Sequence, residues 1–216
     1  MEGVALLVIA KEPLPGRAKT RLTPPCTPAQ AARLAEASLS DTLDAVAATP
    51  AQRKVLVFEG SPQRWRRPGF EVIAQRGHGL GERLAAAFED ADGPALLVGM
   101  DTPQLTPELL SAGIAALRAP GVDAVLGPAL DGGYWSIGLA GPVAGAFANV
   151  PMSSHSTCIR QRTRLRELGL RVHEQPRLRD VDTIEDAFAV AADAPSSRFA
   201  SALAAIHPRG ENPRAA

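Results

Sequence analysis

The chain has few of the residues on which several common protein classes depend. Its 216 residues include only two cysteines, Cys26 and Cys158, too few for a disulfide framework and too far apart for a paired zinc site. Lys and Arg number 23, as do Asp and Glu, and aromatic residues make up 4%. A formal net charge of zero with so few aromatics argues against nucleic acid as a partner. Any anion-binding site must therefore be local.

Long hydrophobic runs are also lacking at the amino terminus. The first apolar run, Val4 to Ala10, is far too short to span a bilayer. It follows Glu2 instead of a basic stretch, and no small-residue cleavage pattern follows it, so it does not read as a signal peptide. We therefore expect a cytoplasmic protein with no membrane partner and with two incidental, reduced thiols.

Short apolar runs bounded by turn residues alternate with helical patterns along the rest of the chain. The runs predict strands at 4–10, 54–58, 71–74, 95–99, 124–127, 135–139 and 171–174. Helices are predicted at 28–48, 81–91, 106–117, 156–168, 183–192 and 197–206, and Thr27-Pro28-Ala29-Gln30 has the pattern of a capping box.

This alternation predicts an α/β three-layer sandwich, with a mostly parallel mixed sheet and helices on both faces. We expect one domain over residues 1–209 and a frayed tail over 210–216. In such a fold, ligands bind beyond the carboxyl ends of the strands. The residues that follow each predicted strand are therefore the first place to look for a site.

A basic loop follows the first predicted strand. Between Lys11 and Leu22 four basic residues face one acid, which gives a local charge of +3 in a neutral protein. Gly16 permits close backbone approach, and Arg17, Lys19 and Arg21 supply donors suited to phosphate oxygens. The spacing is not that of a P-loop, because no Gly-Lys-Ser/Thr closes it. The loop is either a phosphate-binding segment, which we favour, or a solvated basic turn.

Two aspartates follow later predicted elements. Asp101 lies two residues past the run 95–99, where a carboxylate is suited to a divalent cation or to a turn before Pro103. Asp182 precedes the helix that Thr183 caps, so it is either a second metal ligand or a helix-dipole partner. Together the two acids predict a site for Mg²⁺ or Mn²⁺.

Taken together, these segments resemble the nucleotide-diphospho-sugar transferase superfamily, whose fold is called GT-A. Within it the chain resembles the bacterial radical-SAM/selenodomain-associated transferase family, which is related to 2-phospholactate guanylyltransferase and molybdenum-cofactor guanylyltransferase. The resemblance runs from Val4 to about Phe199 and rests on five segments jointly. These are 11–22, 75–83, 99–105, 131–135 and 180–186.

The resemblance implies a role for each segment. Residues Lys11, Gly16, Arg17, Lys19 and Arg21 would grip phosphate, with Lys19, Arg17 and Asp101 catalytic and with Asp101 and Asp182 on the metal. The glycine-rich run 75–83 would let Gly79 and Gly81 approach the nucleotide, unless it is only a connector.

The acceptor end would be formed by the run 131–135 and a later polar stretch. Asp131, Gly132 and Gly133 would face the acceptor, while Trp135 is better explained by core packing. His155 is either a substrate contact or a surface imidazole. Met152 stands where relatives often carry tryptophan, so the acceptor preference of the family does not transfer.

Three functions follow from these residues. We favour Mg²⁺-dependent transfer of a nucleotidyl group from a nucleoside triphosphate to a phosphorylated small molecule, with release of pyrophosphate. The first alternative is glycosyl transfer from a nucleotide-sugar, and the second is a non-catalytic nucleotide-binding module. The sequence identifies neither the base nor the acceptor nor the oligomeric state.

Overall fold

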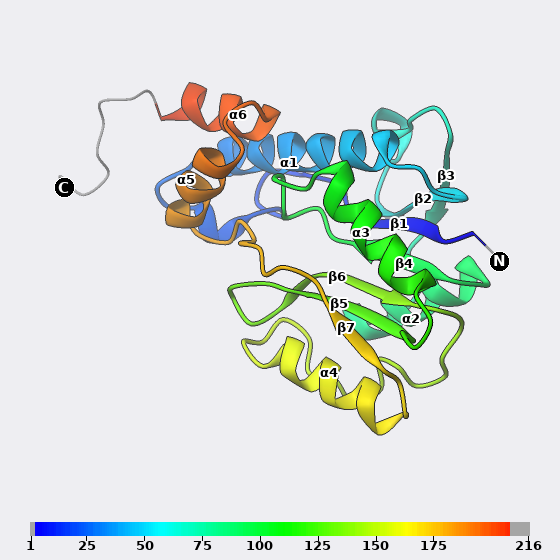
Figure 1. Ribbon diagram of the computed structural model, residues 1–216. Coiled ribbons are helices and arrows are strands. Elements are labelled where there is room, and N and C mark those ends of the chain that lie inside the picture. The colour runs from blue at the N-terminus through cyan, green and yellow to red at the C-terminus, as the bar shows by residue number, and fades with distance from the viewer. Residues whose placement is uncertain (1–2, 208–216) are drawn as a thin grey trace.

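The computed structural model describes residues 3–207, which form a seven-stranded mixed sheet with helices on both faces (Figure 1). The strands are β1 (Ala5–Lys11), β2 (Arg53–Glu59), β3 (Phe70–Ala74), β4 (Ala95–Val98), β5 (Ala124–Pro128), β6 (Tyr134–Leu139) and β7 (Val172–Glu174). Their order in the sheet is β3-β2-β1-β4-β6-β5-β7. Every neighbouring pair is parallel except those that β6 makes with β4 and β5. The predicted α/β fold class is confirmed.

Within residues 3–207, six α-helices and two 3-10 turns accompany the strands, and α5 and α6 follow the last strand. The helices are α1 (Pro28–Ala48), α2 (Leu80–Ala91), α3 (Pro107–Arg118), α4 (Thr157–Glu167), α5 (Ile184–Asp193) and α6 (Arg198–Ile206); the turns are η1 (Thr20–Leu22) and η2 (Gln63–Trp65). Every predicted strand and helix is present, with ends that differ by no more than two residues. Within residues 3–207, no helix is both long and apolar enough to cross a membrane. The predicted tail at 210–216 lies outside the described residues.

Local hydrogen bonds fix where the helices begin. Thr27 Oγ1 accepts from the Gln30 backbone N–H at 3.2 Å while the Gln30 side chain accepts from Thr27 N at 2.7 Å, the predicted capping box. Thr183 and Asp186 form the same arrangement at the start of α5. At α2, by contrast, the N-cap residue Gly79 offers no side-chain cap.

The side chains of the strands alternate between two apolar layers. Leu6 and Val8 of β1 pack with α1 and α3 on one face, and Leu7 packs with α2 and α4 on the other. This alternation follows from the two-residue period of a strand that is covered on both sides. A third cluster joins the outer side of α1 to α5 and α6, so α1 is buried between the sheet and the carboxyl-terminal helices (Figure 1).

Candidate active site

The carboxyl ends of the parallel strands meet the start of β6 at one edge of the sheet. Because β6 is antiparallel, it begins where β4 and β5 end, with Val98 opposite Ser136 and Pro128 opposite Tyr134. The loops after β1 and β4, the 131–135 segment and the 180–182 segment therefore converge. Four segments that are distant along the chain are thus brought to one edge.

A cavity of about 650 Å³ lies at this edge. Seven of the predicted site residues line it: Lys11, Arg21, Asp101, Asp131, Gly133, His155 and Asp182. A smaller adjoining cavity of about 180 Å³ shares Lys11, Arg21, Asp101 and Asp182, and adds Arg17 and Lys19. The structure therefore brings most of the predicted phosphate, acceptor and metal residues together.

Lys19 contacts two other segments of the site, the loop after β4 and the segment before α5. Its backbone adopts the left-handed conformation at φ 50°, and its side chain is only 6% exposed. The Nζ ammonium lies 2.5 Å from Asp101 Oδ1 and also donates to the Val181 carbonyl. Because both contacts are within the protein, Lys19 in this state neutralises Asp101 instead of facing the larger cavity. The cation that the sequence assigned to phosphate thus also positions an acid.

The loop after β4 and the segment before α5 are joined by three further hydrogen bonds. Val181 N donates to the Asp101 carbonyl at 2.9 Å, and Thr102 Oγ1 donates to Asp180 Oδ1 at 3.1 Å. Gln104 Nε2 donates to the Arg179 carbonyl at 2.6 Å. These bonds explain why Asp101 and Asp182, 81 residues apart in the sequence, line the same cavity.

The exposed part of the basic loop points to solvent beside the cavity. Arg21 pairs with Asp182 at 2.7 Å, and its side chain is 68% exposed, so this pair costs little to open when a ligand enters. Lys11 and Arg17 are exposed and have no ion-pair partner within residues 3–207. These three cations are therefore the groups free to meet an anionic ligand.

Asp180 is a site residue that sequence reasoning missed. It lines the cavity together with Asp101 and Asp131. Burial, reinforced by the nearby charges of Asp101 and Asp131, raises the pKa of the Asp180 carboxyl to about 7. The motif Asp180-Val181-Asp182 carried the signal, but the sequence does not show which of its acids faces inward.

The donor chemistry of these acids fits a divalent cation. Asp101, Asp180 and Asp182 line one cavity, and Mg²⁺ in phosphate-handling sites is held by one or two carboxylates with phosphates and waters. No preformed cage of three or more acidic, histidine or cysteine side chains exists within residues 3–207. The arrangement therefore suits a metal that arrives with a phosphate ligand.

The predicted glycines differ in their surroundings. Gly16, Gly79 and Gly81 are not among the residues that line the cavity; a Cβ at Gly16 or Gly79 would meet nothing within 4 Å, whereas one at Gly81 would lie 3.4 Å from Met152 Cε. Their approach to a ligand stays a prediction. Gly132 has φ +90°, and a Cβ there would lie 2.0 Å from the His155 carbonyl oxygen. Its absent side chain therefore lets the 131–135 segment pack on the start of α4 and places His155 at the cavity.

One wall of the cavity is apolar and was not predicted. Ile9, Leu80, Leu84, Tyr134 and Met152 line it. Tyr134 donates to Gln161 Oε1 at 3.4 Å, and burial raises the pKa of its phenol. Trp135 packs in the core, as predicted, and its indole donates to the Pro176 carbonyl at 3.0 Å. The cavity thus has apolar residues suited to contact with a flat ring, in addition to its charged residues.

Solved structures share this fold. A candidate nucleotide-diphospho-sugar transferase from Desulfovibrio desulfuricans G20 is 28% identical with TM-score 0.81, covering 93% of this chain and 92% of that one. CMP:2-keto-3-deoxy-manno-octonic acid synthetase, solved with CTP, is 13% identical with TM-score 0.61, covering 89% and 98%. A nucleotidyl transferase from Methanothermobacter is 15% identical with TM-score 0.61, covering 91% and 100%.

The fold and its strand-end cavity define the class of the protein, a transferase with the nucleotide-diphospho-sugar transferase fold. The chain belongs to the family described as an uncharacterized protein conserved in bacteria, DUF2064, whose model matches residues 32–154. A comparison with curated proteins finds none that matches. The superfamily that the sequence resembles is confirmed, whereas the narrower radical-SAM-associated assignment stays a prediction.

Proposed function

We propose that the protein transfers a nucleotidyl group from a nucleoside triphosphate to a small acceptor and releases pyrophosphate. The observation that carries the proposal is the convergence, on one cavity, of the cations after β1 with the acids after β4 and before α5. A triphosphate has several negative charges, which a neutral protein can bind only at such a local cluster. The nucleotidyl transferase and the CTP complex that share this fold support the same class of reaction.

Different side chains of the cavity have different roles in the proposed reaction. Lys11, Arg17 and Arg21 bind the polyphosphate and stabilise the charge that develops on the departing pyrophosphate. The acceptor oxygen attacks the α-phosphorus, a phosphorus–oxygen bond to the acceptor forms, and the bond to pyrophosphate breaks as the acceptor proton is released. The apolar wall with Tyr134 and Leu80 binds the base. Catalysis then rests on positioning and electrostatics.

Asp101 would hold Mg²⁺ together with Asp182 or Asp180, and the ion would supply charge stabilisation to the phosphates when bound. Lys19 keeps Asp101 in place and neutralised before the ion arrives. This division of roles predicts that Asp101→Asn abolishes magnesium-dependent nucleotide binding while leaving the fold intact, because Asp101 is half-exposed.

The released product tests the proposal. The protein is incubated with magnesium, each nucleoside triphosphate and a set of small acceptors, and phosphorus NMR follows the products. Nucleotidyl transfer yields pyrophosphate and a nucleotide–acceptor conjugate, neither of which forms with Asp101→Asn. Turnover that produces only nucleoside diphosphate from nucleotide-sugars would contradict the proposal.

Glycosyl transfer is the second candidate function, because the 28%-identical structure is a candidate nucleotide-diphospho-sugar transferase. The same acids would then face the diphosphate of a nucleotide-sugar. The number of exposed cations favours the triphosphate, since Lys11, Arg17 and Arg21 all lie beside the cavity. A non-catalytic binding module would bind the same nucleotides but show no turnover in the assay above.

A further inference from the structure

A second hollow, of about 470 Å³, lies on the outer side of α1, and we call it the outer hollow. Six residues with side-chain hydrogen-bond donors line it: Arg33, Ser40, Arg64, Arg67, Arg198 and Ser201. None of the residues that line it lines either cavity of the candidate active site. The outer hollow is therefore a separate feature of the surface.

Helix α1 is the wall between the outer hollow and the candidate active site. Its positions 33, 36, 37 and 40, at three- and four-residue spacing, form one stripe along the hollow. Another side of α1 carries Ala35, which lines the smaller active-site cavity, and Ser38, whose hydroxyl donates to the Met100 carbonyl at 2.6 Å. A ligand in the outer hollow would therefore contact a different side of α1 from a ligand in the active site.

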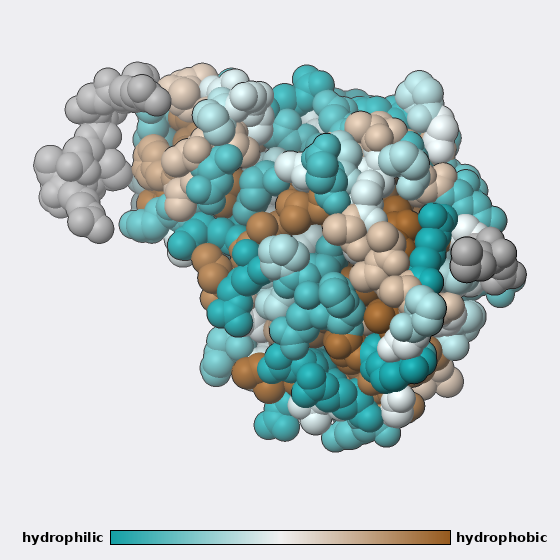
Figure 2. Space-filling view, viewed as in Figure 1, coloured by the Kyte–Doolittle hydropathy of each residue, from teal (hydrophilic) through white to brown (hydrophobic). Residues whose placement is uncertain are grey.

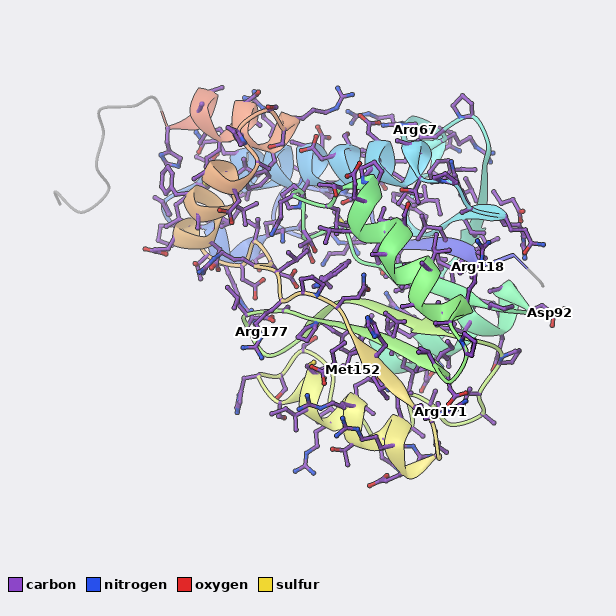
Figure 3. All side chains as sticks on the ribbon, viewed as in Figure 1. Arg67, Asp92, Arg118, Met152, Arg171 and Arg177 are labelled. Atoms are coloured by element: carbon purple, nitrogen blue, oxygen red, sulfur yellow. The ribbon has the colours of Figure 1, made fainter. Side chains whose placement is uncertain are left out.

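The arginines of the outer hollow come from three segments that are distant in the sequence. Arg33 is on α1 and Arg198 is the first residue of α6, whereas Arg64 is in η2 and Arg67, labelled in Figure 3, follows it. Trp65 is 4% exposed and packs in the same apolar cluster as α1, with the Arg64 guanidinium 5.6 Å from the centre of its ring. Buried packing thus holds η2 beside α1.

Acids pair with three of these arginines. Arg64 pairs with Glu36, which also lines the hollow, at 3.1 Å. Asp44 does not line the hollow and lies 2.6 Å from Arg198 and 3.9 Å from Arg67. The Arg64 and Arg198 side chains are 73% and 63% exposed, so water screens both pairs and they open at little cost. These contacts therefore leave the guanidinium groups able to meet an anion.

Arg33 differs from the other three. It is exposed, and among the described residues its side chain forms neither an ion pair nor a hydrogen bond. Asp41, which is also on α1, accepts from the backbone N–H groups of Arg198 and Phe199 at 3.0 and 2.9 Å. Even with this acid included, four arginines stand against three carboxylates. The outer hollow therefore keeps an excess of positive charge and of N–H donors, since each guanidinium has five.

From this convergence we propose that the outer hollow binds a phosphate-bearing small molecule. One guanidinium satisfies the two oxygens of a carboxylate, whereas a phosphate group has more oxygens and more charge and accepts from guanidinium groups on several sides. The hydroxyls of Ser40 and Ser201 supply further donors. This site is additional to the proposed active site and does not depend on the reaction proposed for it.

Calorimetric titration with inorganic pyrophosphate tests the proposal, in a chelator and at constant ionic strength. The wild type should bind pyrophosphate, and the double variant Arg33→Ala with Arg64→Ala should bind it about tenfold or more weakly, because two charged donors are lost. Citrate should bind more weakly than pyrophosphate to the wild type. The control is Arg166→Ala, since Arg166 is exposed on α4 and lines none of the three cavities, and its affinity should equal that of the wild type.

Arg33→Ala alone removes no contact among the described residues, so it keeps the test decisive if the double variant does not fold; it should weaken pyrophosphate binding severalfold. Melting temperatures separate binding from stability. A double variant with a lower Tm and unchanged affinity would show that the arginines only hold α6 and η2 against α1, and would overturn the proposal. So would tighter binding of citrate than of pyrophosphate, or binding that Arg17→Ala abolishes and Arg33→Ala leaves unchanged, which would place the anion in the active site.

Tryptophan fluorescence locates the bound anion. The chain has two tryptophans, and Trp65 lines the outer hollow whereas Trp135 lines the active-site cavity. In Trp135→Phe, pyrophosphate should therefore change the emission of Trp65 with the affinity found by calorimetry. In Trp65→Phe, which keeps Trp135, that change should be absent. A saturable change in Trp65→Phe alone would contradict binding at the outer hollow.

Discussion

Replacing Lys19 should destabilise the protein although the residue lies in a surface loop. The Lys19 ammonium is buried and bonds both the Asp101 carboxylate and the Val181 carbonyl, so it connects η1, the loop after β4 and the segment before α5. A hydrogen bond from a charged donor contributes roughly 1.5–3 kcal/mol. The Asp101 pair adds less, because that carboxylate is 49% exposed and water screens it.

We therefore expect Lys19→Ala to lower the free energy of unfolding by about 2 kcal/mol, which corresponds to a fall of about 4–8 °C in Tm for a domain of this size. Urea and thermal unfolding measure both quantities. Arg17→Ala is the control, since Arg17 is exposed in the same loop and should change stability by less than about 0.5 kcal/mol. Equal stability of the two variants would refute the role of Lys19 as a connection between segments.

Two further predictions concern packing and pH. Gly132→Ala should lower the free energy of unfolding, measured in urea, by about 3 kcal/mol, because φ is +90° and the new Cβ would clash with the His155 carbonyl oxygen. Gly141→Ala is the control and should leave stability unchanged, since a Cβ there has open space around it. Unchanged stability of Gly132→Ala would contradict the prediction. Hydrogen bonds from Arg171 lower the pKa of Asp123 from 3.8 to about 2. Because this pKa is lower in the folded protein than in the unfolded chain, the ionised carboxylate stabilises the fold at pH values above 3.8. The wild type should therefore have a higher Tm than Asp123→Asn near neutral pH, and the difference should shrink as the pH falls toward 2. A difference that grows at lower pH would contradict this prediction.

The sequence predicts the positions of helices and strands better than it predicts which side chains contact one another. The strands and helices were predicted closely because their signals are local: apolar runs of strand length, and caps such as Thr27 and Thr183 that bond within three residues. The strand-end rule also located the cavity, since parallel strands place their following loops at one edge. Hydrophilic residues cover the outer side of α4 (Figure 2), as its arginine-rich sequence implies.

The details of the site depend on contacts that span more than 70 residues of sequence. The sequence assigned Lys19 to phosphate, yet its nearest partners are Asp101 and Val181. It selected Asp182 and overlooked Asp180, because alternation along an irregular segment does not reveal which acid faces inward. Tertiary packing decides each of these orientations.

The central claim is that the strand-end cavity binds a magnesium nucleotide through Asp101. Melting temperatures of wild type, Asp101→Asn and Asp92→Asn are measured with each nucleoside triphosphate, with magnesium or with a chelator. Asp92, labelled in Figure 3 and lying at the carboxyl end of α2, is the control because it lines neither cavity and already has the left-handed backbone that asparagine tolerates. At a hundred times the dissociation constant, a nucleotide should add about 2.7 kcal/mol to the wild type and to Asp92→Asn with magnesium only. The same stabilisation in Asp101→Asn, or none in any protein, would contradict the claim.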